Sequence, residues 1–203
     1  MSGFRSEEIH TIWFGGTGDL TCNFNTAAAT FSWTRDSNNK PVHMATIPST
    51  AHKFSAGSSI FVEGSTAYDG LWKINTVPNA NSFTLLEPSG GTNTFTAETF
   101  TGGGTETGVV SLPCYTPLQL LEFRLKMSAT GGASENFTLT LDANKGAAWD
   151  DLIYTKDMNA VQYIRQVYDP GPTFEIGDVL EFAYANTNGR TWGLLVQYRL
   201  GSL

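Results

Sequence analysis

Few side chains in this sequence are able to carry acid–base or nucleophilic chemistry. Three histidines, His10, His43 and His52, are the candidates for a general base near neutral pH. The sequence has no Gly-x-Ser-x-Gly motif, and neither cysteine stands in a recognisable reactive setting. We therefore predict no catalytic residues and expect a protein that is not an enzyme.

A second candidate chemistry is calcium binding by the segment Asp142-Ala143-Asn144-Lys145-Gly146. Its oxygen-bearing residues alternate as at the start of a calcium loop. A lysine stands inside the segment, however, and Ile153 occupies the position where a bidentate glutamate would close the site. Asp150 and Asp151 could supply ligands in another geometry. We favour a solvated loop and predict no metal site, while ion binding by Asp142, Asp150 and Asp151 stays open.

The glycine-rich run Gly15-Gly16-Thr17-Gly18-Asp19 is of a kind that can bind phosphate. Phosphate loops need a following Gly-Lys-Ser/Thr and a helix whose N-terminus faces the anion. Neither follows this run, and no buried strand of the parallel-sheet type precedes it. We interpret the run as a loop between strands and predict no cofactor.

Aromatic side chains are the remaining candidates for ligand contacts, because exposed rings can stack on sugars. Trp72 and Trp192 lie at alternating strand positions, which favours a place in the core. Trp149 follows Gly146-Ala147-Ala148 in a predicted loop, and Tyr68 precedes an Asp-Gly turn. We predict that Trp149 and Tyr68 are exposed contact residues.

Composition narrows the class of protein. The 203 residues include 15% charged and 12% aromatic residues and 21 glycines, which favours strands and turns over helices. The 12 Lys and Arg residues against 19 Asp and Glu give a net charge of −7, which disfavours nucleic-acid binding. No apolar run approaches the roughly 18–20 residues that span a bilayer, and residues 1–8 contain no apolar stretch of the signal-peptide type. We expect no membrane partner and synthesis in the cytoplasm without export.

The two cysteines, Cys22 and Cys114, are far apart in the sequence and have apolar or aromatic neighbours. A single disulfide between them is one alternative. We favour two buried free thiols, which fit a reducing compartment.

The elements that must position these side chains are predicted to be strands. In the C-terminal half, apolar residues alternate with polar ones in four segments. The apolar members are Leu121, Phe123, Leu125 and Met127, then Phe137, Leu139 and Leu141, then Leu180, Phe182 and Tyr184, then Trp192, Leu194, Val196 and Tyr198. We expect the turn at 186–189 to join the last two segments as a hairpin, and 161–167 to form a further strand.

These patterns predict an all-β fold. One antiparallel sheet would leave an apolar face in water, so a second sheet must cover it. The aromatic residues of 1–35 are suited to supply that sheet. Short strands at 54–62, 71–76 and 82–86 form a separate pattern typical of a small barrel. We predict an antiparallel, jelly-roll-like β-sandwich of residues 1–40 and 106–203, with a small β-barrel module inserted at 41–105.

Two parts of the chain resemble known proteins. The run from Phe54 to Gly64, then Tyr68-Asp69-Gly70-Leu71-Trp72-Lys73-Ile74 and Asn81-Ser82-Phe83-Thr84-Leu85, is similar to a small barrel module. That module recurs in virion proteins of tailed bacteriophages and is similar to the small barrel inserted in ubiquitin-activating enzymes. The segments Phe137–Asp142, Trp149–Tyr154 and Gly177–Leu180, with the strand at Trp192, resemble the β-sandwich of phage head-decoration and minor virion proteins.

The resemblance implies a structural protein of a bacteriophage virion. The role that we expect is capsid decoration, in which the protein binds the assembled shell and stabilises it like a cement. A tail, baseplate or fibre component is one alternative. A carbohydrate-binding module for host adhesion, with Trp149 or Tyr68 as the stacking ring, is another. The implied partners are the major capsid protein or tail proteins and further copies of this chain, a trimer being one arrangement. The implied location is the virion, after synthesis in the host cytoplasm.

Overall fold

The computed structural model describes residues 8–18, 20, 29–35, 41–48, 54–62, 70–86, 98–100 and 109–201. The chain divides into two compact units. The first unit combines Met1–Thr21 with Thr107–Leu203, and the second consists of Cys22–Glu106.

Strands account for nearly all of the regular structure. The first unit contains β1 (Ile9–Thr17), β8 (Val109–Pro113), β9 (Leu118–Met127), β10 (Asn136–Asp142), the short 3₁₀ helix η1 (Ala147–Trp149), β11 (Asp151–Asp157), β12 (Tyr163–Val167), β13 (Thr173–Phe174), β14 (Val179–Ala183) and β15 (Thr191–Leu200). The second unit contains β2 (Ala29–Arg35), β3 (Pro41–Pro48), β4 (Ser59–Val62), β5 (Gly70–Asn79), β6 (Ser82–Leu86) and β7 (Glu98–Phe100).

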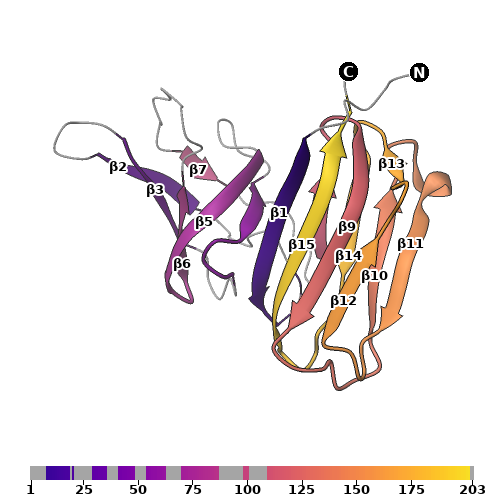
Figure 1. Ribbon diagram of the computed structural model, residues 1–203. Coiled ribbons are helices and arrows are strands. Elements are labelled where there is room, and N and C mark those ends of the chain that lie inside the picture. Colours follow the sequence, from indigo (N-terminus) through magenta and orange to yellow (C-terminus); the bar gives the residue numbers. More distant parts are fainter. Residues whose placement is uncertain are drawn as a thin grey trace. The chain divides into compact units, whose positions relative to one another are not determined.

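The first unit is a sandwich of two antiparallel sheets (Figure 1). In the first sheet the strand order is β1-β15-β9-β12, with β13 also paired to β9; in the second it is β11-β10-β14-β8. We name them the front sheet and the back sheet. The predicted all-β antiparallel sandwich is confirmed.

Aromatic rings fill the space between the two sheets. Phe123 of the front sheet is fully buried, and its ring centroid lies 5.7 Å from that of Phe137 and 5.7 Å from that of Phe182. Tyr154 meets the Phe123 ring edge-on at 5.1 Å. Phe137, Tyr154 and Phe182 all belong to the back sheet, so the ring of Phe123 is central to the contact between the sheets.

Strand β9 departs from the predicted alternation at Leu121. Leu118 and Leu120 are buried, and so are Phe123, Leu125 and Met127, whereas Leu121 is only half-buried. The pairing between β15 and β9 shifts register there, because Gln197 faces Glu122 while the next residue, Tyr198, faces Leu120. The extra residue of this bulge reverses which side chains face inward.

The turn at 186–189 does not close a hairpin, so that prediction was wrong. β14 pairs with β10 and β8 in the back sheet, and β15 pairs with β1 and β9 in the front sheet. Buried Asn186, at a φ of 47°, donates from Nδ2 to the carbonyl oxygens of Gly18 and Arg190, and its Oδ1 accepts the Arg190 N–H. These hydrogen bonds hold the connection as it passes from one sheet to the other.

The second sheet of the sandwich also has a different origin from the one expected. It consists of β8, β10, β11 and β14, and of the two strands described within residues 1–35, β1 belongs to the first unit and β2 to the second. β2 pairs with β3 and β7 in the second unit. The first stretch of the sandwich unit thus ends at residue 21 rather than 40, because the partner strand of β2 lies within the segment expected to be an insertion.

The second unit holds a six-stranded sheet in the order β4-β5-β6-β3-β2-β7. Ile60, Ile74, Phe83 and Leu85 are fully buried, and the Phe54 and Phe83 rings meet edge-on at 5.4 Å. The described pairings give an open order of strands, and the predicted inserted barrel is not confirmed.

Cys114 is a free, buried thiol, as expected; Cys22 lies outside the described residues. Burial, with a smaller effect of the Asp178 carboxylate, raises the pKa of the Cys114 thiol to about 12. Among the described residues, no helix has the length and apolar character needed to cross a bilayer.

Candidate functional site

Of the two predicted contact residues, only Trp149 lies in the described part of the chain. It ends η1, and its side chain is 66% exposed. Tyr68 lies outside the described residues. Trp149 stands in the loop between β10 and β11, with the exposed Asp150 as its next neighbour.

One carboxylate of the suggested calcium segment, that of Asp150, and a carboxylate of the neighbouring loop accept hydrogen bonds from backbone amides. Asp150 Oδ1 accepts the Ala143 N–H at 2.9 Å. Asp178, on the neighbouring loop, accepts the Asn144 N–H at 3.1 Å and the Glu175 N–H at 2.8 Å. Among the described residues, no three His, Cys, Asp or Glu side chains gather as a metal site. These carboxylates act as caps that hold the loop between β10 and β11.

The run at Gly15 is part of a strand, so the prediction of a loop was wrong there. β1 continues to Thr17, with Gly15 opposite Gly193 and Gly16 opposite Trp192 of β15. The reason is cross-strand packing that the local sequence does not reveal. A Cβ placed on Gly15 would lie 2.7 Å from Cζ2 of Trp13, and one on Gly193 would lie 2.9 Å from Nε1 of the same ring. The paired glycines leave the space that the Trp13 indole occupies.

Strand register arranges the outer face of the front sheet in three rows, each with one residue from β1, β15, β9 and β12 in that order. Residues directly opposite each other have Cβ atoms about 4.5–5.5 Å apart. The rows are Thr11-Gln197-Glu122-Val167, Trp13-Leu195-Arg124-Arg165 and Gly15-Gly193-Lys126-Tyr163. Aromatic and cationic side chains therefore gather in the last two rows.

Glu122 organises the cations of this face. Its carboxylate accepts hydrogen bonds from Arg165, Nε to Oε1 at 2.9 Å and Nη2 to Oε2 at 3.2 Å, and a further one from Nε of Arg124. The hydrogen bonds from Arg165 and then Arg124 lower the pKa of Glu122 to about 2, against the opposing effect of its burial. Three positive side chains and one carboxylate leave these rows with an excess of positive charge on a chain of net charge −7.

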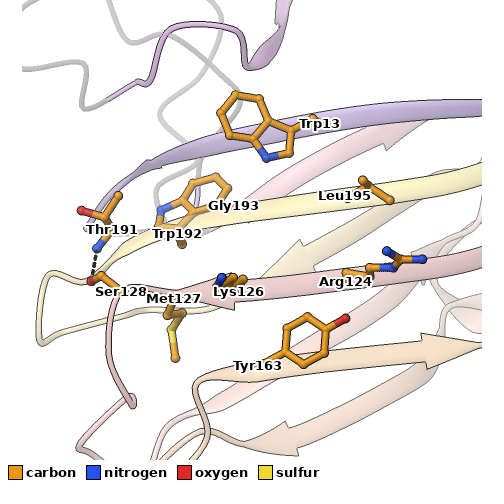
Figure 2. Close-up of a pocket in the computed structure, with 10 residues that line it drawn as sticks. All are labelled: Trp13, Arg124, Lys126, Met127, Ser128, Tyr163, Thr191, Trp192, Gly193 and Leu195. Atoms are coloured by element: carbon orange, nitrogen blue, oxygen red, sulfur yellow. Dashed lines mark hydrogen bonds between the residues drawn. The ribbon is translucent and has the colours of Figure 1, made fainter.

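Residues of the second and third rows line an open groove with a volume of about 470 Å³ (Figure 2). Trp13 on β1 and Tyr163 on β12 stand on opposite sides, with Arg124 and Lys126 of β9 between them. At one end, the Thr191 N–H donates to Ser128 Oγ at 3.2 Å. Ligand pockets commonly span about 300–1,000 Å³, so we name this candidate site the outer groove.

The rings and the cationic donors that line the outer groove are available to a ligand. Trp13 is 36% exposed and Tyr163 50%. Lys126 is exposed and forms no ion pair with a described residue. No described residue accepts a hydrogen bond from the terminal guanidinium nitrogens of Arg124, which reaches Glu122 through Nε. The groove can thus offer two ring faces and two cationic donors to an anionic ligand.

Sequence reasoning did not single out these residues. Arg124 and Lys126 fall at the polar positions that alternate with Phe123, Leu125 and Met127 in a predicted strand, and Trp13 received no role. A Trp-x-Gly spacing places both residues on the same face of a strand, and this was the available signal at Trp13 and Gly15. Nothing local connected them with Gly193 or Tyr163, which come from β15 and β12.

No protein-family model matches this chain, and no curated protein matches it in sequence.

Proposed function

We propose that this protein is a structural protein of a bacteriophage virion and that it decorates the assembled capsid. The sandwich unit adheres to a neighbouring subunit and adds buried interface, which raises the free energy needed to open the shell. The partners under this proposal are the major capsid protein and further copies of this chain.

The observation that carries the proposal is the side of the sandwich formed by β11 and β12. Each is the last strand of its sheet among the described strands, so backbone donors and acceptors along both remain available to another chain. The two strands are consecutive in the sequence and run in opposite directions (Figure 1). The start of β11 and the end of β12 therefore lie at the same end of the sandwich.

Large apolar side chains are exposed at that end. Leu152 near the start of β11 is 54% exposed, Val167 at the end of β12 is 50% exposed, and Trp149 just before β11 is 66% exposed. Single exposed apolar residues are ordinary, whereas apolar residues beside open strand edges favour association. This combination supports a role in adhesion to a neighbouring subunit.

The test locates the protein on intact particles. Antibodies against the recombinant chain are applied to purified particles from the source of the gene, and mass spectrometry measures the copy number. Labelling over the capsid with hundreds of copies is the expected result. A small multiple of three or six copies on the tail would replace decoration by the tail, baseplate or fibre alternative. Particles that lack the chain would overturn the proposal.

Two variants connect the binding to the β11 edge. Leu152→Lys places a charge at the start of β11, and we expect it to abolish binding to particles without loss of the fold. The matched control is Ile9→Lys, because Ile9 is 53% exposed on β1, the strand at the opposite end of the front sheet. Equal binding by both variants would contradict the assignment of this edge.

A further inference from the structure

The outer groove combines two features that rarely serve the fold itself: ring faces open to solvent, and cationic nitrogens, on Lys126 and at the end of Arg124, to which no described residue is bonded. We propose that it binds an acidic oligosaccharide, a chain of sugar rings that carries carboxylates. The proposal rests only on residues of the sandwich unit, and it stands whether or not the protein decorates a capsid.

The aromatic residues define the length of the ligand. Trp13 and Tyr163 come from the two outer strands of the front sheet, with β15 and β9 between them. Three spacings of about 4.8 Å between strands place β1 and β12 roughly 14 Å apart, and the offset of two residues in register between Trp13 and Tyr163 adds to this distance. One sugar ring is shorter than this span, so an oligosaccharide is needed to touch both rings.

The fold provides a place for the Trp13 ring on the sheet before any ligand arrives. Gly15 and Gly193 face each other, and any side chain at either would contact the indole. The ring therefore lies along the sheet with part of its surface exposed. A preorganised ring loses little conformational entropy when an apolar sugar face stacks on it.

The cations define the charge of the ligand. Glu122 accepts a hydrogen bond from Nε of Arg124, which orients this guanidinium while its terminal nitrogens remain available. A carboxylate matches the fork of a guanidinium. Lys126 lies next to Tyr163 in register and supplies a second positive charge. A sugar carboxylate between Arg124 and Lys126 would contact both cations.

The balance of charges favours an acidic sugar over a single-stranded nucleic acid. Nucleic acids also stack on aromatic rings, but they carry a charge at every phosphate and need a continuous basic track. Here Glu122 lies beside Arg124 and Arg165, and the chain as a whole carries a net charge of −7. A short acidic saccharide needs only its own carboxylates to meet Arg124 and Lys126, so it is compatible with this surface.

The experiment is a calorimetric titration of the full chain with acidic oligosaccharides. The probes are oligogalacturonate and oligomers of N-acetylneuraminate; the matched controls are methyl-esterified oligogalacturonate and an oligo-dT of similar length. We expect at least one acidic sugar to bind, with an affinity that falls as salt rises and is lost on esterification. The proposal would be overturned if neither acidic sugar binds, if methyl-esterified oligogalacturonate binds as tightly as oligogalacturonate, or if oligo-dT binds more tightly than the acidic sugars.

Variants then assign the binding to the outer groove. We expect Trp13→Ala and Lys126→Gln each to weaken binding about tenfold, which corresponds to roughly 1.4 kcal/mol. The controls are Trp149→Ala and Lys156→Gln, because both residues are exposed and neither lines the groove. Equal losses in the control variants would show that the sugar binds elsewhere. Lys126→Gln and the ester comparison decide the question even if Trp13→Ala fails to fold.

Discussion

The inner and outer faces of β9 differ in what their side chains contribute to the protein. Phe123, Leu125 and Met127 face inward and are almost completely buried. Arg124 and Lys126, which alternate with them, face outward into the groove. One strand thus carries the residues that bind the two sheets together and the residues that we assign to ligand binding.

The difference shows that stability and binding can be separated on this strand. Burial of apolar surface explains the inner residues, because each contributes about 1.5–3 kcal/mol of hydrophobic stabilisation. The outer cations gain little from the fold, since exposed ion pairs contribute only about 0–1 kcal/mol. Changes on the two faces should therefore have different consequences for stability and for binding.

The largest effect is expected at Phe123, the ring in contact with Phe137, Tyr154 and Phe182. Phe123→Ala leaves a cavity between the sheets and should lower the free energy of unfolding by about 3–5 kcal/mol. Urea denaturation measures it. Lys126→Ala on the outer face is the control, with an expected change within about 0.5 kcal/mol. A smaller loss for the Phe123 variant than for the control would contradict the assignment of stability to the inner face of β9.

A smaller effect is expected at Gly15 of β1, which lies on the outer face next to the Trp13 ring. Gly15→Ala forces the Trp13 indole out of its place and should cost about 1–3 kcal/mol, as overpacking does elsewhere. In the double variant Trp13→Ala/Gly15→Ala the clash with the ring is gone. The second substitution should then cost much less than it does alone, and a double-mutant cycle measures the coupling. Additive losses would mean that the glycine does not accommodate the ring.

The lowered pKa of Glu122 predicts that the stability of the protein depends on pH. Its pKa of about 2 in the folded protein lies below the ordinary value of 4.5, so the unfolded chain binds more protons between these values. The stabilisation is present above about pH 4.5 and is lost as the pH falls toward 2. Glu122→Gln should flatten this acid limb in denaturation measured from neutral to acid pH. Glu8→Gln, at an exposed residue, is the control, and an equally steep limb in Glu122→Gln would argue against the ion pairs.

The smallest effect is expected at Trp149, which is the most exposed of the large apolar residues described. Its side chain is 66% exposed, so Trp149→Ala should change the free energy of unfolding by less than about 0.5 kcal/mol. Thermal or urea denaturation measures it. A loss comparable to that of Phe123→Ala would show that this ring packs against the protein and is unsuited to adhesion.

Much of the strand content could be predicted from residue periodicity. Leu180, Phe182 and Tyr184 are buried as expected, and so are Trp192, Leu194 and Val196, because alternation places such residues on one face of a strand. The segment 163–167 is a strand, in accord with the interpretation of 161–167. The error at Leu121 came from a bulge, which inserts one residue and which the alternation of neighbouring residues cannot reveal.

The candidate site was less predictable than the strands. The exposure of Trp149 agrees with its place in a glycine-led loop, yet this residue does not line the outer groove. The groove depends on Gly15 facing Gly193 and on Tyr163 facing Lys126, which are pairings between residues far apart in the sequence. Neither pairing has a local signal, so Trp13 and Lys126 could not be connected in advance.

The amino-acid sequence alone determined that this chain folds as strands with one apolar face each, because side-chain alternation and turn residues act over a few positions. Only the tertiary structure decided which strands pair. It assigned β14 and β15 to different sheets although a short turn joins them, and it joined β2 to β3 and β7 rather than to the sandwich. The physical reason is that pairing depends on burial summed over whole sheets. Many alternative strand pairings satisfy the same local pattern. The pairing that forms covers both apolar faces, and it leaves the Trp13 ring and the cations of β9 on a common outer surface.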